Sequence, residues 1–202
     1  MSIINKISLF IFIGFILSYT FKLIILYKTY GIKANSLGNK DKPLDIFITE
    51  ISLKISTFIW GGLWFFQAIN ININNKLFKF IFENLNIRYL GVGINFIGLL
   101  VFIIAMVNMG LSWRVGIDKK SKSKLITRGV YKFTRNPAFV GFDLMFLGLF
   151  LTFPNVITLV VSVVNIIFIH RLILEEEKHL ISMFNNEYYS YKSKTPRYIF
   201  FK

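Results

Sequence analysis

Five apolar runs separated by polar connectors dominate the hydropathy pattern of the chain. They are Ile7–Tyr27, Ile46–Ile69, Tyr89–Met109, Ala138–Phe153 and Asn155–Ile169. A helix that crosses a bilayer needs about 20 mostly apolar residues. The first run is too long for a secretory signal peptide, and no small-residue cleavage site follows it. The pattern therefore predicts an all-α, polytopic membrane protein with about five transmembrane helices.

Local signals refine these elements. Pro154-Asn155 predicts a tight turn between the last two runs, which are also the shortest. Apolar residues recur at about helical spacing among the charges of 170–202, which predicts a C-terminal amphipathic helix. The apolar patch Leu77–Phe82 is expected to lie at the membrane surface. Glu50 and Lys54 are four residues apart on a helix and can pair. Glycines 91, 93 and 98 would allow close backbone approach by a neighbouring helix or a ligand.

Composition and charge support a membrane location. The chain has 202 residues, of which 54% are hydrophobic and only 17% are charged, and its net charge is +14. The Lys and Arg residues lie in the connectors, which is typical of cytoplasmic loops rather than of a nucleic-acid-binding surface. No nucleic-acid partner is expected. The strongly basic loop over 110–137 and the C-terminal block are predicted to be cytoplasmic, and an odd number of spans then places the N-terminus outside.

Several kinds of catalytic site are absent from the sequence. There is no cysteine, so thiolate nucleophiles and Cys-ligated zinc are excluded. Glu176-x-x-His179 has the spacing of half a di-iron site, but the second half is missing, so no metal is expected. HExxH, GxSxG and P-loop motifs are also missing. Gly91-Val92-Gly93 lies inside an apolar run, where close helix packing explains it better than nucleotide binding.

Two polar blocks bracket the apolar hairpin 139–169 and must emerge on the same side of the membrane, where they form one polar pocket. The first block, Ser123–Gly141, contains Arg135-Asn136-Pro137 at a helix entry, where a capping Asn and a Pro at the first helical position are both common. The second block, Arg171–Arg197, contains Glu175-Glu176-Glu177. Carboxylates near a bilayer are usually paired or functional. These acids form either a solvated helix face or a site for a cationic ligand such as a sulfonium or an ammonium.

The order and spacing of these blocks resemble a known superfamily, the integral-membrane isoprenylcysteine carboxyl methyltransferases and phospholipid N-methyltransferases. The resemblance covers about the last hundred residues. Its elements are Met109–Arg114, Leu125–Tyr131, Arg135–Gly141, Glu175-Glu176, Phe184–Tyr188 with Tyr191, and Pro196-Arg197. It implies a single membrane methyltransferase domain over 1–202, with a cofactor-binding half at about 89–202.

The resemblance also implies roles for individual residues. S-adenosylmethionine would be the cofactor, and its pocket would be lined by Leu125, Ile126, Tyr131, Arg135, Asn136, Pro137, Ala138, Phe139 and Glu176. Glu175 would support Glu176, and Arg171 would bind the methyl acceptor. The acceptor would be lipid-like or prenylated and would enter from the membrane, and the site would face the cytoplasm of an inner or plasma membrane. Its catalysis would consist mostly of alignment if the acceptor is a carboxylate.

Two residues depart from the family pattern, and three functions remain open. Asn136 stands where the family usually has His, and Phe139 where it usually has Tyr; these changes either tune the site or mark a relative without activity. An isoprenylcysteine carboxyl O-methyltransferase-like activity is expected first, and a phospholipid N-methyltransferase-like activity second. The third alternative is a non-catalytic transport or assembly protein, which would carry charges inside its spans. Asp143, one turn into the fourth run, is the residue that fits it best.

Overall fold

The computed structural model describes residues 1–70, 75–117 and 124–199, and these form an all-helical molecule. The helices are α1 (Ile3–Tyr30), α2 (Leu44–Ala68), α3 (Leu85–Met109), α4 (Pro137–Thr152) and α5 (Val156–Lys194), with short 3₁₀ turns η1 (Lys76–Phe78), η2 (Gly110–Ser112) and η3 (Gly129–Lys132). Four of the described helices, all except α4, are long and apolar enough to cross a membrane. The predicted polytopic helical fold is thus confirmed.

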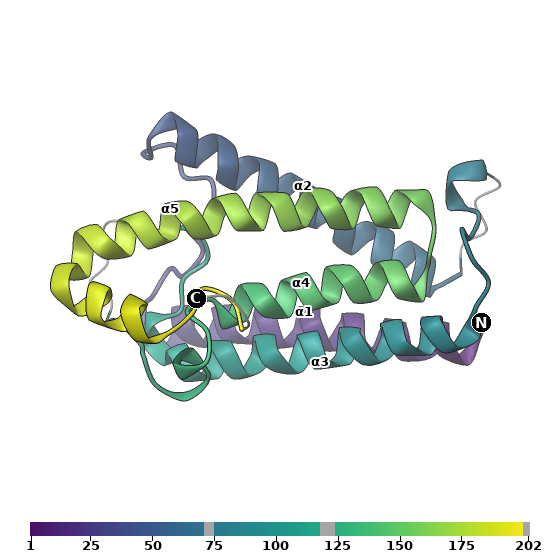
Figure 1. The fold of residues 1–202 in the computed structure, drawn as a ribbon, viewed down its shortest axis with the longest axis horizontal. Coiled ribbons are helices and arrows are strands. Elements are labelled where there is room, and N and C mark those ends of the chain that lie inside the picture. Colours follow the sequence, from purple (N-terminus) through teal and green to yellow (C-terminus); the bar gives the residue numbers. More distant parts are fainter. Residues whose placement is uncertain (71–74, 118–123, 200–202) are drawn as a thin grey trace.

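The centre of the predicted basic loop, with Asp118, Lys119, Lys120 and Lys122, lies outside the described residues. In the part that is described, α4 lies between α3 and α5, α1 packs behind α3, and α2 runs obliquely along α5 (Figure 1). The α4 helix has 16 residues, so it is about 24 Å long. It is therefore shorter than the four long helices and is supported on both sides by two of them.

Close packing of α3 against α4 depends on glycines that face each other. A Cβ built on Gly98 would lie 2.7 Å from the carbonyl oxygen of Gly141, and one built on Gly141 would lie 2.8 Å from that of Gly98. A Cβ on Gly91 would meet the backbone of α4 at Thr152. The predicted close approach is therefore confirmed at Gly91 and Gly98. No neighbouring helix comes close at Gly93, whose Cβ would meet no described neighbour within 4 Å.

The last helix is longer than predicted. The turn at Pro154-Asn155 is confirmed, because Asn155 caps α5 and its side chain accepts a hydrogen bond from the backbone N–H of Thr158 at 3.0 Å. From there α5 continues without a break past His170, so the expected fifth span and amphipathic helix are one element. A kink occurs only at Asn185, where φ is 42° and ψ is −120°. Glu175, Glu176 and Glu177 thus lie on the same continuous stretch of helix as the apolar half of α5, before the kink.

A buried carboxylate ties the first connector to the segment after η2. Glu50 is fully buried and accepts hydrogen bonds from Lys42 Nζ at 2.6 Å, from the Gly38 N–H at 2.6 Å and from the Ile117 N–H at 2.8 Å. The predicted Glu50–Lys54 pair is wrong, because Lys54 is exposed whereas Glu50 turns toward the connector. This arrangement fixes residues 113–117 against α2.

Candidate active site

The start of α4 is anchored by long-range contacts rather than by a helix cap. Asn136 occupies the N-cap position, but no capping hydrogen bond of its side chain is found among the described residues. Its Nδ2 instead donates to the carbonyl oxygen of Arg197 at 3.2 Å and to Glu177 Oε1 at 3.5 Å. The capping interpretation of Asn136 is therefore wrong. The side chain turns toward the C-terminal segment and α5.

Glu177 is the centre of a buried ion cluster. Arg135 donates to Glu177 Oε1 through Nε at 3.1 Å and Nη2 at 2.8 Å. Arg197 donates to Glu177 Oε1 through Nε at 3.2 Å and to Oε2 through Nη2 at 2.9 Å. The hydrogen bond to Glu177 raises the pKa of Arg197, so the Arg197 guanidinium stays protonated. The cluster joins α5, the start of α4 and the C-terminal segment.

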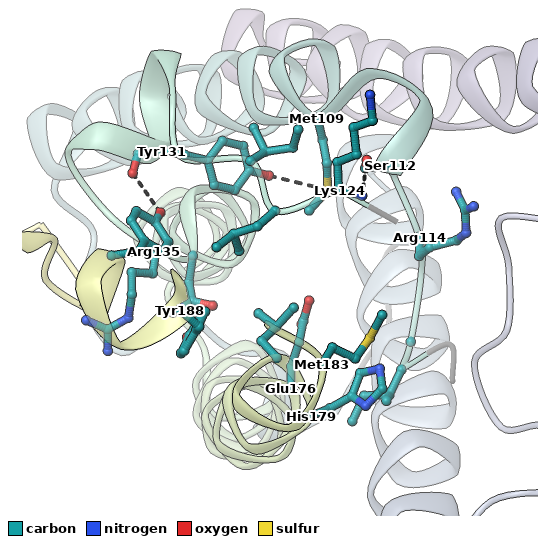
Figure 2. Close-up of a pocket in the computed structure, with 17 residues that line it drawn as sticks. Met109, Ser112, Arg114, Lys124, Tyr131, Arg135, Glu176, His179, Met183 and Tyr188 are labelled. Carbon is teal, nitrogen blue, oxygen red and sulfur yellow. Dashed lines mark hydrogen bonds between the residues drawn. The ribbon is translucent and has the colours of Figure 1, made fainter. Parts of the chain in front are cut away.

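Glu176, the neighbour of Glu177, has a different environment. Successive residues of an α-helix point about 100° apart, and Glu176 points into a polar cavity at this end of the bundle (Figure 2). None of the described residues donates a hydrogen bond to its carboxylate. The cavity is lined by Met109, Ser112, Arg114, Gly116, Ile117, Lys124, Leu125, Ile126, Tyr131, Arg135, Asn136, Glu176, His179, Leu180, Met183, Tyr188 and Tyr191.

Tyr131 forms a rigid wall of the polar cavity. Its backbone carbonyl accepts a hydrogen bond from the Tyr191 hydroxyl at 2.7 Å, and its own hydroxyl approaches the Met109 sulfur at 3.6 Å. Burial, and secondly the charge of Glu176, raise the pKa of the Tyr131 phenol. The phenol is therefore protonated at neutral pH and presents a neutral aromatic surface beside the Glu176 carboxylate.

A large apolar groove opens directly into the polar cavity. Its volume is about 1010 Å³, and its walls come from α1, α2, α4 and the first half of α5. Seven residues line both spaces: Met109, Arg114, Gly116, Tyr131, Arg135, Asn136 and Glu176. A molecule with a polar head and an apolar tail would fit with its head near these shared residues and its tail along the helices.

The nine residues that the resemblance assigned to a cofactor pocket are gathered around these two spaces. Leu125 and Ile126 line the polar cavity. Pro137, Ala138 and Phe139 line the apolar groove. The other four, Tyr131, Arg135, Asn136 and Glu176, line both.

The two residues predicted to act on the acceptor lie elsewhere. Arg171 is exposed, and the Glu175 carboxylate accepts a hydrogen bond from Lys178 at 2.7 Å. Neither residue is among the described residues that line the two spaces. The α5 face that reaches the groove carries Leu172 and Glu176. Residues 171 and 175 each precede these by one position, so their side chains point about 100° away from that face.

Arg114 is a site residue whose role the sequence did not assign. It stands at the junction of cavity and groove, and its Nη1 donates to the carbonyl oxygens of Leu111 and Trp113 at 2.9 and 2.8 Å. Tyr188 and Tyr191 also line the cavity. The only signal for these three in the sequence was their place in the blocks that carried the family resemblance.

The fold and the site together define a helical, multi-pass membrane protein with a polar cavity that opens into a lipid-sized apolar groove. A sequence model of the family described as phospholipid methyltransferase matches residues 86–187, which is half of the chain. The chain belongs to this family. The resemblance inferred from the sequence blocks is thereby confirmed.

Two curated proteins are similar to this chain. The protein-S-isoprenylcysteine O-methyltransferase of Schizosaccharomyces pombe is 33% identical over 140 residues, which cover 67% of this chain and 58% of the relative. The protein of the same name from Saccharomyces cerevisiae is 32% identical over 122 residues, which cover 59% of this chain and 51% of the relative. The chain thus spans somewhat more than half the length of the curated relatives it matches.

Proposed function

We propose that the protein is a membrane methyltransferase that transfers a methyl group from S-adenosylmethionine to the carboxylate of a prenylated or otherwise lipid-like acceptor. The observation that carries this proposal is the direct opening of the polar cavity into the apolar groove at Tyr131, Asn136 and Glu176. A soluble cofactor and a lipid-like acceptor would meet at that opening. The names of both similar proteins support O-methylation and do not favour amine methylation or a non-catalytic role.

The side chains that line the polar cavity have the chemical character that the proposed cofactor requires. S-adenosylmethionine, when bound, supplies a methyl group activated by a positively charged sulfonium. Glu176 provides a carboxylate for that cationic region, because it is directed into the cavity and is left unpaired by the described residues. Glu177 is already occupied by Arg135 and Arg197. Leu125, Ile126 and other apolar residues of the cavity offer surface for the uncharged parts of the cofactor.

The acceptor end of the site needs alignment more than proton transfer. A carboxylate is a nucleophile at neutral pH, so the protein has to hold it in line with the methyl group and keep water away. Arg114 lines both spaces, and a guanidinium binds a carboxylate through two parallel hydrogen bonds. We therefore assign the acceptor contact to Arg114 and propose no contact for Arg171 or Glu175.

The proposed orientation places the site on the cytoplasmic side. The described parts of the 110–137 loop, 110–117 and 124–137, lie at the site end of the bundle, and α1 begins at the opposite end (Figure 1). By the positive-inside rule, the site end would be cytoplasmic and the N-terminus outside. A cysteine introduced at Ser193 should resist an impermeant thiol reagent in intact cells, whereas one at Lys76 should react. Labelling of the cysteine at position 193 and not of the one at position 76 would show that the orientation is the reverse of the one proposed.

Cofactor binding tests the proposed site. Glu176→Gln removes the charge that faces the cation, and a charged hydrogen bond of this kind contributes about 1.5–3 kcal/mol. The Kd for S-adenosylmethionine, measured by calorimetry in detergent, should rise about 10- to 100-fold. Glu175→Gln, one position along the same helix and outside both spaces, should leave the Kd unchanged. Equal Kd values for wild type and both variants would remove Glu176 from the cofactor site.

A further inference from the structure

The apolar groove has a closed end and an open end because α1 and α2 diverge. At the end away from the site, the Trp64 Nε1–H donates to the Ser8 hydroxyl at 2.8 Å. Phe12 packs beside Trp64 and Phe65, with ring centroids 5.4 and 6.1 Å apart. Toward the site the two helices separate, with α2 following α5 while α1 follows α3 (Figure 1). Phe12 and Phe65 both line the groove, so we take their aromatic contact as its end away from the site.

One face of α2 forms a long wall of the groove, and it is interrupted by two glycines. Lys54, Phe58 and Phe65 recur on this wall at helical spacing, and Gly61 and Gly62 stand between the two phenylalanines. A Cβ at Gly62 would meet no described atom within 4 Å, and one at Gly61 would meet only Phe12, at 3.9 Å. These two positions therefore have room for side chains that the sequence does not supply.

Glycine is poorly suited to the interior of an exposed helix, where it costs about 1 kcal/mol relative to Ala. Close helix packing explains Gly98 and Gly141, each of which has a backbone atom within 3 Å of its Cβ position. It does not explain Gly61 and Gly62, which lie beside open space. Because they have no side chains, the two glycines leave extra space in the groove just before its closed end.

We infer that Gly61, Gly62 and the Phe12–Phe65 contact set the longest apolar chain that the groove accepts. This inference rests on the proposed function, since it treats the groove as the place of the acceptor's tail. At 1.5 Å per residue, about 16 Å of helix separates Lys54 from Phe65. A single extended chain lying along α2 would reach the glycines and end against the aromatic pair. The occupant is accordingly an acceptor with one long apolar chain.

The test is a chain-length series of prenylcysteine analogues carrying geranyl, farnesyl or geranylgeranyl groups. Gly62→Leu fills the open space with a side chain. Each methylene kept out of an apolar site lowers affinity about fourfold. The KM of Gly62→Leu should therefore rise at least about tenfold for the longest analogue and least for the shortest. The Kd for S-adenosylmethionine should stay unchanged.

A matched glycine provides the control. Gly93 lies on the exposed side of α3, its Cβ would also meet no described atom within 4 Å, and it is not among the described residues of either space. Gly93→Leu should leave all three KM values as in wild type. The reciprocal variant Phe12→Ala removes the closing ring and should lower the KM of the longest analogue. An equal rise for all three analogues in Gly62→Leu, or the same change in Gly93→Leu, would overturn the inference.

Binding of the same three analogues is measured alongside turnover, by their displacement of a fluorescent farnesyl analogue. If wild type transfers methyl to none of them, the proposed reaction is wrong, and the length series is then read from binding alone. If Gly62→Leu weakens binding of the longest analogue most, the result would still support a limit on chain length set by Gly61, Gly62 and the Phe12–Phe65 contact. If wild type transfers methyl but binds the three analogues equally well, the inferred limit on chain length is wrong and the proposed reaction stands.

Discussion

The substitution Glu177→Gln tests how the site is held together. Glu177 and Arg135 have side chains that are only 5% and 6% exposed, so removal of the negative charge leaves a buried guanidinium without its counter-ion. Breaking a buried ion pair by removing one partner costs about 3–5 kcal/mol. The lower end of that range, about 3 kcal/mol, is appropriate here. Arg197 is 31% exposed and can be hydrated, and Arg135 keeps its hydrogen bond to the Thr195 carbonyl.

The measurement is thermal unfolding of purified protein in detergent. A loss of about 3 kcal/mol lowers the Tm of a chain of this length by on the order of 10 °C. The matched control is Glu175→Gln, which breaks a pair with Lys178, a side chain that is 71% exposed. Exposed pairs contribute about 0.2–1 kcal/mol, so the control should lower the Tm by at most a few degrees. Equal Tm values for the two variants would show that the cluster does not hold α4 and the C-terminal segment to α5.

Two further predictions concern packing and the acceptor. Gly141→Ala places a Cβ 2.8 Å from the carbonyl oxygen of Gly98. The resulting overpacking should lower the free energy of unfolding, measured by chemical denaturation, by about 1–3 kcal/mol. An unchanged free energy of unfolding would mean that α3 and α4 can move apart without cost. Arg114→Lys should lower kcat/KM for a carboxylate acceptor because an ammonium cannot form the two-pronged bond, whereas Arg171→Lys should have no effect; the opposite result would return the acceptor contact to Arg171.

The apolar runs were sufficient to predict the helices. Each run became a helix, and the turn at Pro154-Asn155 lies where two turn-forming residues meet. The end of α5 was not predictable in the same way. The residues after Ile169 are more polar, but no Gly or Pro interrupts them before Pro196, so the helix continues while its surroundings change. A change of polarity marks where a helix leaves the apolar layer and not where it ends.

Side-chain direction and long-range pairing explain what the sequence left undetermined in the site. Residues 175–178 of α5 are all charged. The sequence pattern alone therefore does not determine which of the three acids faces the cavity. Packing against α2 and α4 turns Glu176 to the cavity and Glu177 to Arg135. Arg197 is 20 residues beyond Glu177, and no local spacing rule connects them.

The most direct test of the proposed function uses purified protein in liposomes with radiolabelled S-adenosylmethionine and a farnesylcysteine analogue. A carboxyl methyl ester releases its label as methanol in alkali, whereas a methylated amine retains it. The proposal predicts alkali-labile label on the analogue, which is strongly reduced in Glu176→Gln and unchanged in Glu175→Gln. Bound cofactor without transfer to the analogue, or alkali-stable label on phosphatidylethanolamine instead, would contradict it.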